Sequence, residues 1–203
     1  ASDVYKRHLA SASDSYAIGT NSVSSAESST AIGSQALASA SDSYAIGSDA
    51  EAAAKRSTAI GTDSTAVGTR STAIGSQALA SASDSYAIGS KARATKQNSL
   101  AFGSGARSTH LNSLAFGTQA RSLGHASTAI GTDSTAAGSS SIAIGTGSNA
   151  TGYQSTAIGF AAQAHRNNEM ALGTRASQYR LRGLSPKGGS VSYTHLRAHE
   201  TLD

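Results

Sequence analysis

The amino-acid sequence predicts an all-β protein, a β-solenoid in which short coils of chain stack along one axis. Three observations lead to this prediction: a glycine recurs every 14 residues, apolar residues alternate with small ones, and large apolar side chains are scarce. The 203 residues include 21 Gly, 1 Pro, 3 Phe and no Cys or Trp. Because a compact globule needs Leu, Ile, Val and Phe to fill its interior, this composition excludes an ordinary globular domain.

The repeat has a strict period. Two residues before each repeat glycine stands Ala, one before stands an apolar residue, and four before stands Ser in eleven of twelve cases, with Glu169 as the exception. An unbroken period of this kind indicates a solenoid whose units contact only their neighbours. The structural repeat glycines are Gly19, Gly33, Gly47, Gly61, Gly75, Gly89, Gly103, Gly117, Gly131, Gly145, Gly159 and Gly173.

Each unit is expected to form one coil of β-structure. Fourteen residues are too few for the helix pair of a helical repeat, which takes about 33, but suffice for two strands and two tight turns. Apolar positions such as Thr30 and Ile32 share one face with period 2, and Ser and Ala occupy the other. The glycine falls where the chain turns. Twelve coils stacked at the usual strand spacing would give a rod of about 55–60 Å.

The apolar residue before each glycine is predicted to form a continuous narrow core. Full burial of one Ile contributes about 2–3 kcal/mol, whereas ordering each residue costs about 1–2 kcal/mol, so a single chain is marginal. We therefore predict a homo-oligomer in which copies pack through small-residue faces. The predicted core residues are Ile18, Ile32, Ile46, Ile60, Ile74, Ile88, Phe102, Phe116, Ile130, Ile144, Ile158 and Leu172.

Several units resemble a known family. The segments 98–103 and 112–117 both read NSLAFG, and segment 141–148 reads SIAIGTGS. They closely resemble the Asn-Ser-Val-Ala-Ile-Gly-x-x-Ser signature of the YadA-like head domain of trimeric autotransporter adhesins. The resemblance implies a left-handed parallel β-roll of about twelve 14-residue coils, assembled as an intertwined homotrimer.

The same resemblance implies function and location. The implied role is a cell-surface adhesin head, a virulence factor that attaches to host extracellular matrix proteins such as collagen or fibronectin, or to other cells, and causes autoagglutination. The implied location is the bacterial cell surface. The expected link to the outer membrane is an anchor outside this fragment, which is itself expected to be soluble.

The repeat frame also predicts domain boundaries. Residues 1–184 are expected to form the head repeat domain, with a degenerate first coil at 1–14 and a divergent last coil at 168–184. Residues 185–190 are expected to be a linker. Residues 191–203 break sharply in composition and resemble translated sequencing adapter, so we expect a non-native or disordered tail.

Candidate ligand contacts come from two patterns. Asn98, Ser99, Asn112 and Ser113 open the two clean copies of the signature. Tyr16, Tyr44 and Tyr86 share one position of the 14-residue frame. Aromatic residues often anchor interfaces, but these tyrosines could equally cover coil corners with the hydroxyl in water.

The sequence carries no pattern typical of an enzyme, a metal site or a cofactor site. Cysteine is absent, and no P-loop or His-Glu-x-x-His motif occurs. Between Gly19 and Gln163 eight basic and seven acidic residues nearly balance. Nucleic-acid binding is not expected, because basic residues are not interleaved with aromatic ones.

Two other functions share the predicted fold. A passive β-solenoid spacer could present another binding domain. An ice-binding β-solenoid needs a regular array of Thr, but here the relevant column is interrupted by Tyr16, Leu100 and Met170, among others.

Overall fold

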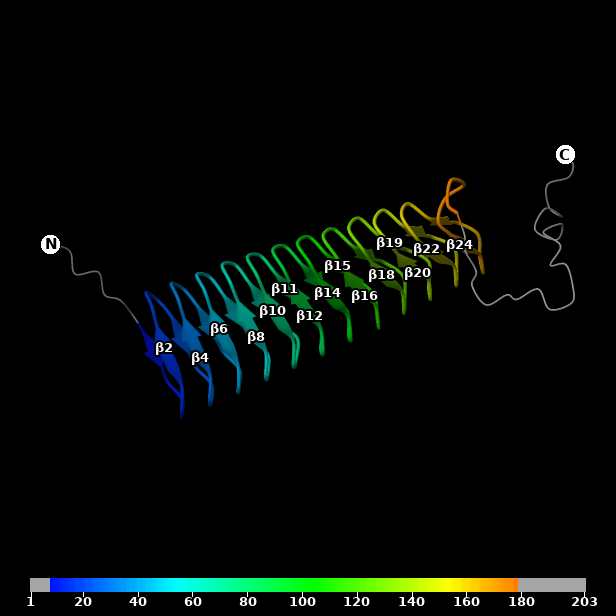
Figure 1. Ribbon diagram of the computed structural model, residues 1–203. Helices are drawn as coiled ribbons and strands as arrows, with labels where there is room; N and C mark the ends of the chain where they lie inside the picture. The colour runs from blue at the N-terminus through cyan, green and yellow to red at the C-terminus, as the bar shows by residue number, and fades with distance from the viewer. Residues whose placement is uncertain (1–7, 179–203) are drawn as a thin grey trace, which may run out of the picture.

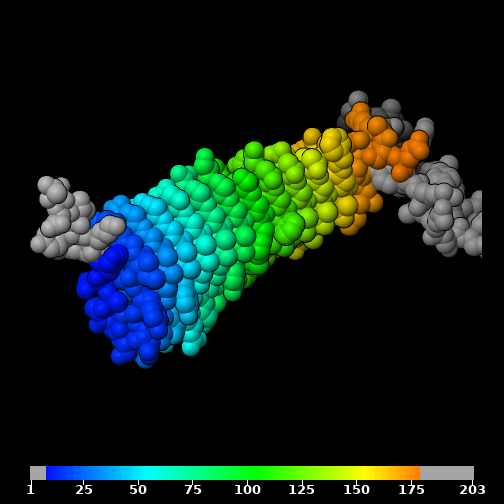
Figure 2. Space-filling model, turned by 60° about the vertical axis from the view of Figure 1, so that its left-hand side comes forward, coloured from blue at the N-terminus to red at the C-terminus, as the bar shows by residue number. Residues whose placement is uncertain are grey.

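The computed structural model describes residues 8–178. The chain there winds into a rod of successive coils, each contributing one strand to each of two parallel sheets (Figure 1). Figure 2 shows the same rod from another side, with the coils following one another in sequence order. Among the described residues no helix has the length and apolar character needed to cross a lipid bilayer. The predicted linker 185–190, the tail 191–203 and the ends of the predicted first and last coils lie outside the described residues.

The two sheets each contain 12 strands. The odd sheet consists of β1 (Leu9–Ala10), β3 (Val23–Ser24), β5 (Leu37–Ala38), β7 (Glu51–Ala52), β9 (Thr65–Ala66), β11 (Leu79–Ala80), β13 (Arg93–Ala94), β15 (Arg107–Ser108), β17 (Arg121–Ser122), β19 (Thr135–Ala136), β21 (Asn149–Ala150) and β23 (Gln163–Ala164). The even sheet consists of β2 (Tyr16–Ile18), β4 (Thr30–Ile32), β6 (Tyr44–Ile46), β8 (Thr58–Ile60), β10 (Thr72–Ile74), β12 (Tyr86–Ile88), β14 (Leu100–Phe102), β16 (Leu114–Phe116), β18 (Thr128–Ile130), β20 (Ile142–Ile144), β22 (Thr156–Ile158) and β24 (Met170–Leu172).

Every strand pairs with the strand one coil away, in register. Ala31 lies beside Ala45 and Ile32 beside Ile46, a separation of 14 residues, and the same offset holds in the odd sheet. The predicted parallel β-solenoid of about twelve coils is therefore confirmed. The strands are only two or three residues long, because turns take up most of each coil.

The turns divide each coil into two halves. A residue with a left-handed backbone conformation recurs every seven residues, from Asp14 to Asn168, with φ between 51° and 68°. Most of these positions hold Asp, Asn, Ser, Gln or Arg, although Asn and Asp adopt this conformation most easily. The half-coils therefore share one turn geometry although their sequences differ.

The repeat glycines occupy a different turn position. From Gly19 to Gly159 their φ lies between 118° and 140°, a region that side chains rarely allow. Space is also lacking, because a Cβ added to Gly61 would lie 2.7 Å from the carbonyl carbon and oxygen of Gly75 in the next coil. Glycine at this position therefore permits both the turn and the close stacking of coils.

The interior is filled by alanine and serine, not by isoleucine. The middle residue of each even strand, such as Ala45, and the second residue of each odd strand, such as Ala52, are fully buried through the inner coils. The largest fully buried side chains are serines. The space between the two sheets is therefore too narrow for a larger side chain. The strands alternate as predicted, but the small residues face inward and the larger apolar residues face outward.

The predicted core is wrong for this reason. The residues preceding the glycines point outward and are half-buried or exposed, with Ile18 at 59% and Phe116 at 55% of their full accessibility. The same correction applies to Ile32, Ile46, Ile60, Ile74, Ile88, Phe102, Ile130, Ile144, Ile158 and Leu172. Copies of the chain also cannot pack through the small residues as predicted, because those residues face inward.

Most buried serine hydroxyls hydrogen-bond to the turn backbone, whereas those of Ser43 and Ser141 have no partner among the described residues. The Oγ of Ser85 donates to the carbonyl of Ala82 at 2.6 Å and accepts from the Ala82 N–H at 3.3 Å. Where an odd strand holds Ser instead of Ala, a second bond crosses the interior, as from Ser108 Oγ to the Ser113 carbonyl at 2.8 Å. Because buried polar groups need such partners, serine is well suited to this position.

The last coil replaces this serine with Glu169. Its carboxylate accepts hydrogen bonds from the backbone N–H groups of His165 and Arg166, both at 2.7 Å. The bonds from Arg166 and His165, in that order, lower the pKa of Glu169, because they favour the charged form. The carboxylate therefore closes the turn before β24 in place of the serine hydroxyl.

Substituting a repeat glycine should destabilise the rod. We expect Gly61→Ala to lower the free energy of unfolding by about 2 kcal/mol or more, because the turn conformation is strained and the next coil obstructs the Cβ. Chemical denaturation monitored by circular dichroism measures this change.

The matched control is Gly147→Ala. Gly147 has φ 67°, an added Cβ there would meet nothing closer than 4.0 Å, and the equivalent position one coil later is already Ala161 with φ 52°. We expect this change to lower the unfolding free energy by about 1–2 kcal/mol, the cost of a left-handed backbone for a residue with a Cβ, and by less than Gly61→Ala, which also obstructs the next coil. Equal destabilisation by both substitutions would contradict the role assigned to the repeat glycines.

Glu169 should titrate below the ordinary glutamate range, which lies near pH 4.3. Because its folded pKa is lowered, its contribution to the last coil is complete above the ordinary value and disappears as pH falls through the folded value. The backbone amide chemical shifts of His165 and Arg166, followed by NMR as pH falls, report this titration. In the control Glu169→Ser these shifts should show no transition in the glutamate range, and a wild-type midpoint at or above the ordinary value would contradict the capping role.

Candidate functional surfaces

The rod presents two long outer faces. We define the apolar face as the outward side chains of the even strands, and the polar face as the outward side chains of the odd strands. On the apolar face the residues preceding the repeat glycines form one column, in which the rings of Phe102 and Phe116 lie with centroids 6.0 Å apart. Because every strand pairs in register, each column runs from coil to coil without a shift.

The predicted tyrosine contacts lie on the apolar face. Tyr16, Tyr44 and Tyr86 begin the strands β2, β6 and β12 and expose 61%, 45% and 38% of their surface. They form the second column of this face together with Thr, Leu, Ile and Met residues of the other even strands. Because Thr30 separates Tyr16 from Tyr44, the tyrosines form no continuous aromatic surface.

The two clean signature copies divide into exposed and buried residues. Asn98 and Asn112 lie exposed at stacked turns, and the Nδ2 of Asn98 donates to the Oδ1 of Asn112 at 3.0 Å. Ser99 and Ser113 are fully buried, and Ser113 Oγ donates to the His110 carbonyl at 2.5 Å. The prediction that these serines contact a ligand is therefore wrong, because their hydroxyls serve the turns.

The polar face contains residues that the sequence analysis did not single out. Arg93, Arg107 and Arg121 occupy the same outward position in the consecutive strands β13, β15 and β17, and all three are exposed. We call these three residues the arginine ladder. The ladder is not visible in the total charge of a long segment, where basic and acidic residues nearly balance. It becomes visible when residues 14 positions apart, one coil from each other, are compared.

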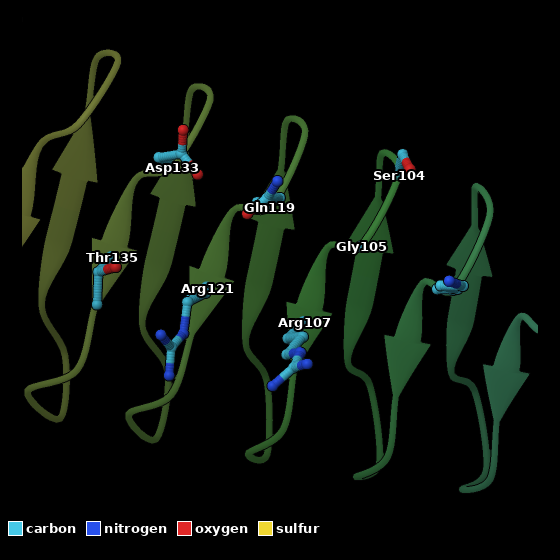
Figure 3. Close-up of a pocket in the computed structure, with 8 residues that line it drawn as sticks. Ser104, Gly105, Arg107, Gln119, Arg121, Asp133 and Thr135 are labelled. Atoms are coloured by element: carbon cyan, nitrogen blue, oxygen red, sulfur yellow. The ribbon is translucent and has the colours of Figure 1, made fainter.

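A shallow groove of about 490 Å³ is lined by two residues of the arginine ladder, Arg107 and Arg121. In Figure 3, Arg107, Arg121 and Thr135 follow one another along one face, while Ser104, Gln119 and Asp133 lie at the turns above them. Lys91 and Gly105 complete the lining. The groove is polar and open, so it suits contacts with a large charged ligand better than enclosure of a small molecule.

Ion pairs elsewhere link stacked turns. Arg70 binds Asp84 one coil away through two hydrogen bonds of 2.6 and 2.7 Å. The bidentate hydrogen bonds raise the pKa of Arg70 and lower that of Asp84, since each charge stabilises the other. Arg56 and Asp42 approach to 4.0 Å at the same turn column. These two pairs are the ion pairs within residues 8–178.

Within the same residues no cluster of three His, Cys, Asp or Glu side chains could hold a metal ion. A second shallow concavity, of about 740 Å³, lies at the end of the rod and is lined by residues including His165, Glu169 and Arg175. Glu169 is engaged there in closing the turn before β24. The extended faces, with one side chain per coil, are therefore the surfaces on which a function can be argued.

Comparison with known proteins agrees with this architecture. The family model for the YadA head domain repeat matches at residues 10–36, 38–64, 66–92, 80–106, 94–120, 122–148 and 150–176. No curated protein matches the chain. Among solved structures, the collagen-binding domain of the Yersinia adhesin YadA is similar, with 22% identity, 87% of this chain and 79% of that chain covered, and a TM-score of 0.45. Because the family model covers nearly all of residues 10–176, this chain belongs to the family of YadA head domain repeats.

Proposed function

We propose that the chain is the head of a cell-surface adhesin that acts as a homotrimer. The observation that carries the proposal is the in-register stacking of equivalent positions through twelve coils, in a chain of the YadA head repeat family. Such a rod can make a similar weak contact with a ligand at many coils. Because the contacts are linked, each one raises the effective concentration for the next, and the overall avidity increases. A regular, extended surface of this kind suits an extended ligand, such as a collagen fibre, better than a small one.

The apolar face supports self-association. The column of residues that precede the repeat glycines holds Ile, Phe or Leu in every coil. Members such as Ile32, Ile144 and Ile158 expose 37–39% of their surface. Together these residues form a continuous apolar strip, which marks an interaction site on a protein surface. A parallel copy of the same chain presents the same column with the same spacing, so it matches the strip along its whole length. The polar face then remains outward for ligands.

A carboxylate on the apolar face should therefore disrupt the assembly. We expect Ile60→Glu combined with Ile88→Glu to shift the protein from trimer to monomer, because a charge buried in an apolar interface is strongly unfavourable. Light scattering measures the mass, with the monomer at 20.2 kDa.

The matched control for this experiment is Leu79→Glu combined with Gln163→Glu on the polar face. Neither position has an acidic partner in an adjacent strand, because Leu79 pairs with Thr65 and Arg93, and Gln163 pairs with Asn149. The control should remain trimeric. A monomeric wild-type protein, or variants of the apolar face that stay trimeric, would contradict assembly through this face.

An adhesin and a passive spacer differ in how binding depends on length. Residues 29–48 and 71–90 are identical, so deleting residues 49–90 removes three coils and joins residue 48 to Lys91 in an unchanged local sequence. For an adhesin, we expect the deletion to weaken binding to immobilised collagen or fibronectin by about tenfold or more, through lost avidity. Surface plasmon resonance measures this, with light scattering on the same sample as a check on assembly.

The control is a single change in a retained motif. Asn98→Ala should weaken binding by less than about threefold, because no single contact dominates a multivalent surface. A single substitution that abolishes binding would contradict the multivalent mechanism. Absence of binding by the intact trimer to collagen, fibronectin and cells would favour the spacer.

A further inference from the structure

Three like charges stack directly above one another in the arginine ladder. Arg93 pairs in register with Arg107, and Arg107 with Arg121. Adjacent strands lie about 4.8 Å apart, so the guanidinium groups extend from neighbouring positions on one face. Like charges placed opposite each other destabilise a sheet. The ladder therefore opposes stability unless something neutralises it.

The coils that hold the arginine ladder supply no neutralising charge of their own, and Asp133 is the single acidic residue in the lining of the groove. Residues 85–132 contain five basic side chains, which are Lys91, Arg93, Lys96, Arg107 and Arg121, and no Asp or Glu. In contrast, residues 9–84 contain seven acidic and three basic side chains. The cationic region thus lies in the middle of the rod, next to an acidic half.

The same architecture pairs opposite charges elsewhere. Arg70 and Asp84 occupy equivalent turn positions one coil apart and form a bidentate pair. Positions one coil apart can therefore hold an intramolecular partner, yet neither ion pair among residues 8–178 includes an arginine of the ladder. The three guanidinium groups keep their hydrogen-bond donors available for an external anion.

We propose that the polar face from β13 to β19 binds a linear sulfated polysaccharide, with its sulfate groups on the arginine ladder. Guanidinium groups bind such anions with two parallel hydrogen bonds. The groove beside the ladder supplies Ser104, Gln119 and Thr135 as polar partners for sugar hydroxyls. Lys91 extends the cationic surface at one end, and Asp133 ends it at the other.

A nucleic acid fits this surface less well. Unpaired bases bind proteins largely by stacking on aromatic side chains, and the groove lining contains none. The aromatic residues of the same coils, Tyr86, Phe102 and Phe116, belong to the even sheet. The polar face thus offers charges and hydroxyl partners without a stacking platform.

This inference goes beyond the proposed adhesive function, because it assigns a ligand class to one defined face. It does not require collagen or fibronectin binding, and collagen binding can fail while it holds. A trimer assembled through the apolar face would carry three such ladders, directed outward.

The test measures binding of the full chain to immobilised heparin as the sulfated probe. Wild-type protein should bind with an affinity that falls steeply with salt, because ionic contacts release counterions. The variant Arg93→Gln, Arg107→Gln, Arg121→Gln should bind at least about tenfold more weakly, the loss of about 1.4 kcal/mol. Because these side chains are exposed, thermal unfolding of the variant should match the wild type or improve.

The matched control removes three positive charges elsewhere, with Lys55→Gln, Arg56→Gln and Arg70→Gln. It should retain heparin affinity within about twofold, since these residues lie in the acidic half of the rod. Equal losses in both variants would mean that net charge alone drives binding, and would overturn the assigned site.

Two further probes define the ligand class. Desulfated heparin should not compete, and single-stranded DNA should compete much more weakly than heparin. Equal or better binding of DNA would overturn the choice of a sulfated polysaccharide. Replacing the three arginines by lysine should restore only part of the affinity, because lysine keeps the charge but loses the bidentate geometry.

Discussion

The close approach of two short parallel sheets governs the rest of this structure. Because each coil has only 14 residues and much of it is turn, the interior accepts no fully buried side chain larger than serine. Alanine methyl groups supply the buried apolar surface, and serine hydroxyls satisfy the turn backbone. The repeat glycines let successive coils stack, since a Cβ at Gly61 would meet the backbone of Gly75. Stability therefore depends on an interior in which small residues, alanine or serine, recur from coil to coil along the described rod.

This narrow interior leaves the larger side chains outside. Isoleucine and phenylalanine contribute one column of the apolar face, which one chain leaves partly exposed, and charged residues occupy the polar face and the turns. Because the strands stack in register, a residue type that recurs at the same position in several coils forms a column on the surface. The proposed adhesion by many weak contacts, the proposed assembly through the apolar face and the proposed anion binding on the arginine ladder all depend on such columns.

Much of the architecture could be predicted before the structure. The glycine period, the two-residue alternation and the family resemblance led to the parallel solenoid that the structure confirms. The candidate sites fared less evenly: Asn98 and Asn112 are exposed, whereas Ser99 and Ser113 are buried. Only an outward side chain can contact a ligand, and the motif contains both inward and outward residues. The motif alone therefore does not identify ligand contacts. To find the arginine ladder, residues 14 positions apart in the sequence must be compared with one another.

The sequence by itself determined the period, the stacking register and the positions that must be glycine, because a local rule repeated every 14 residues leaves a chain few other folds. It did not determine which side of each strand faces inward. Alternation distinguishes two faces of a strand but does not indicate which face is buried. The usual preference for burying isoleucine predicts that the isoleucine face is buried, which is wrong here. Only the distance between the two sheets, a property of the folded coil, decided that alanine and serine fill the interior and that the isoleucine column faces outward.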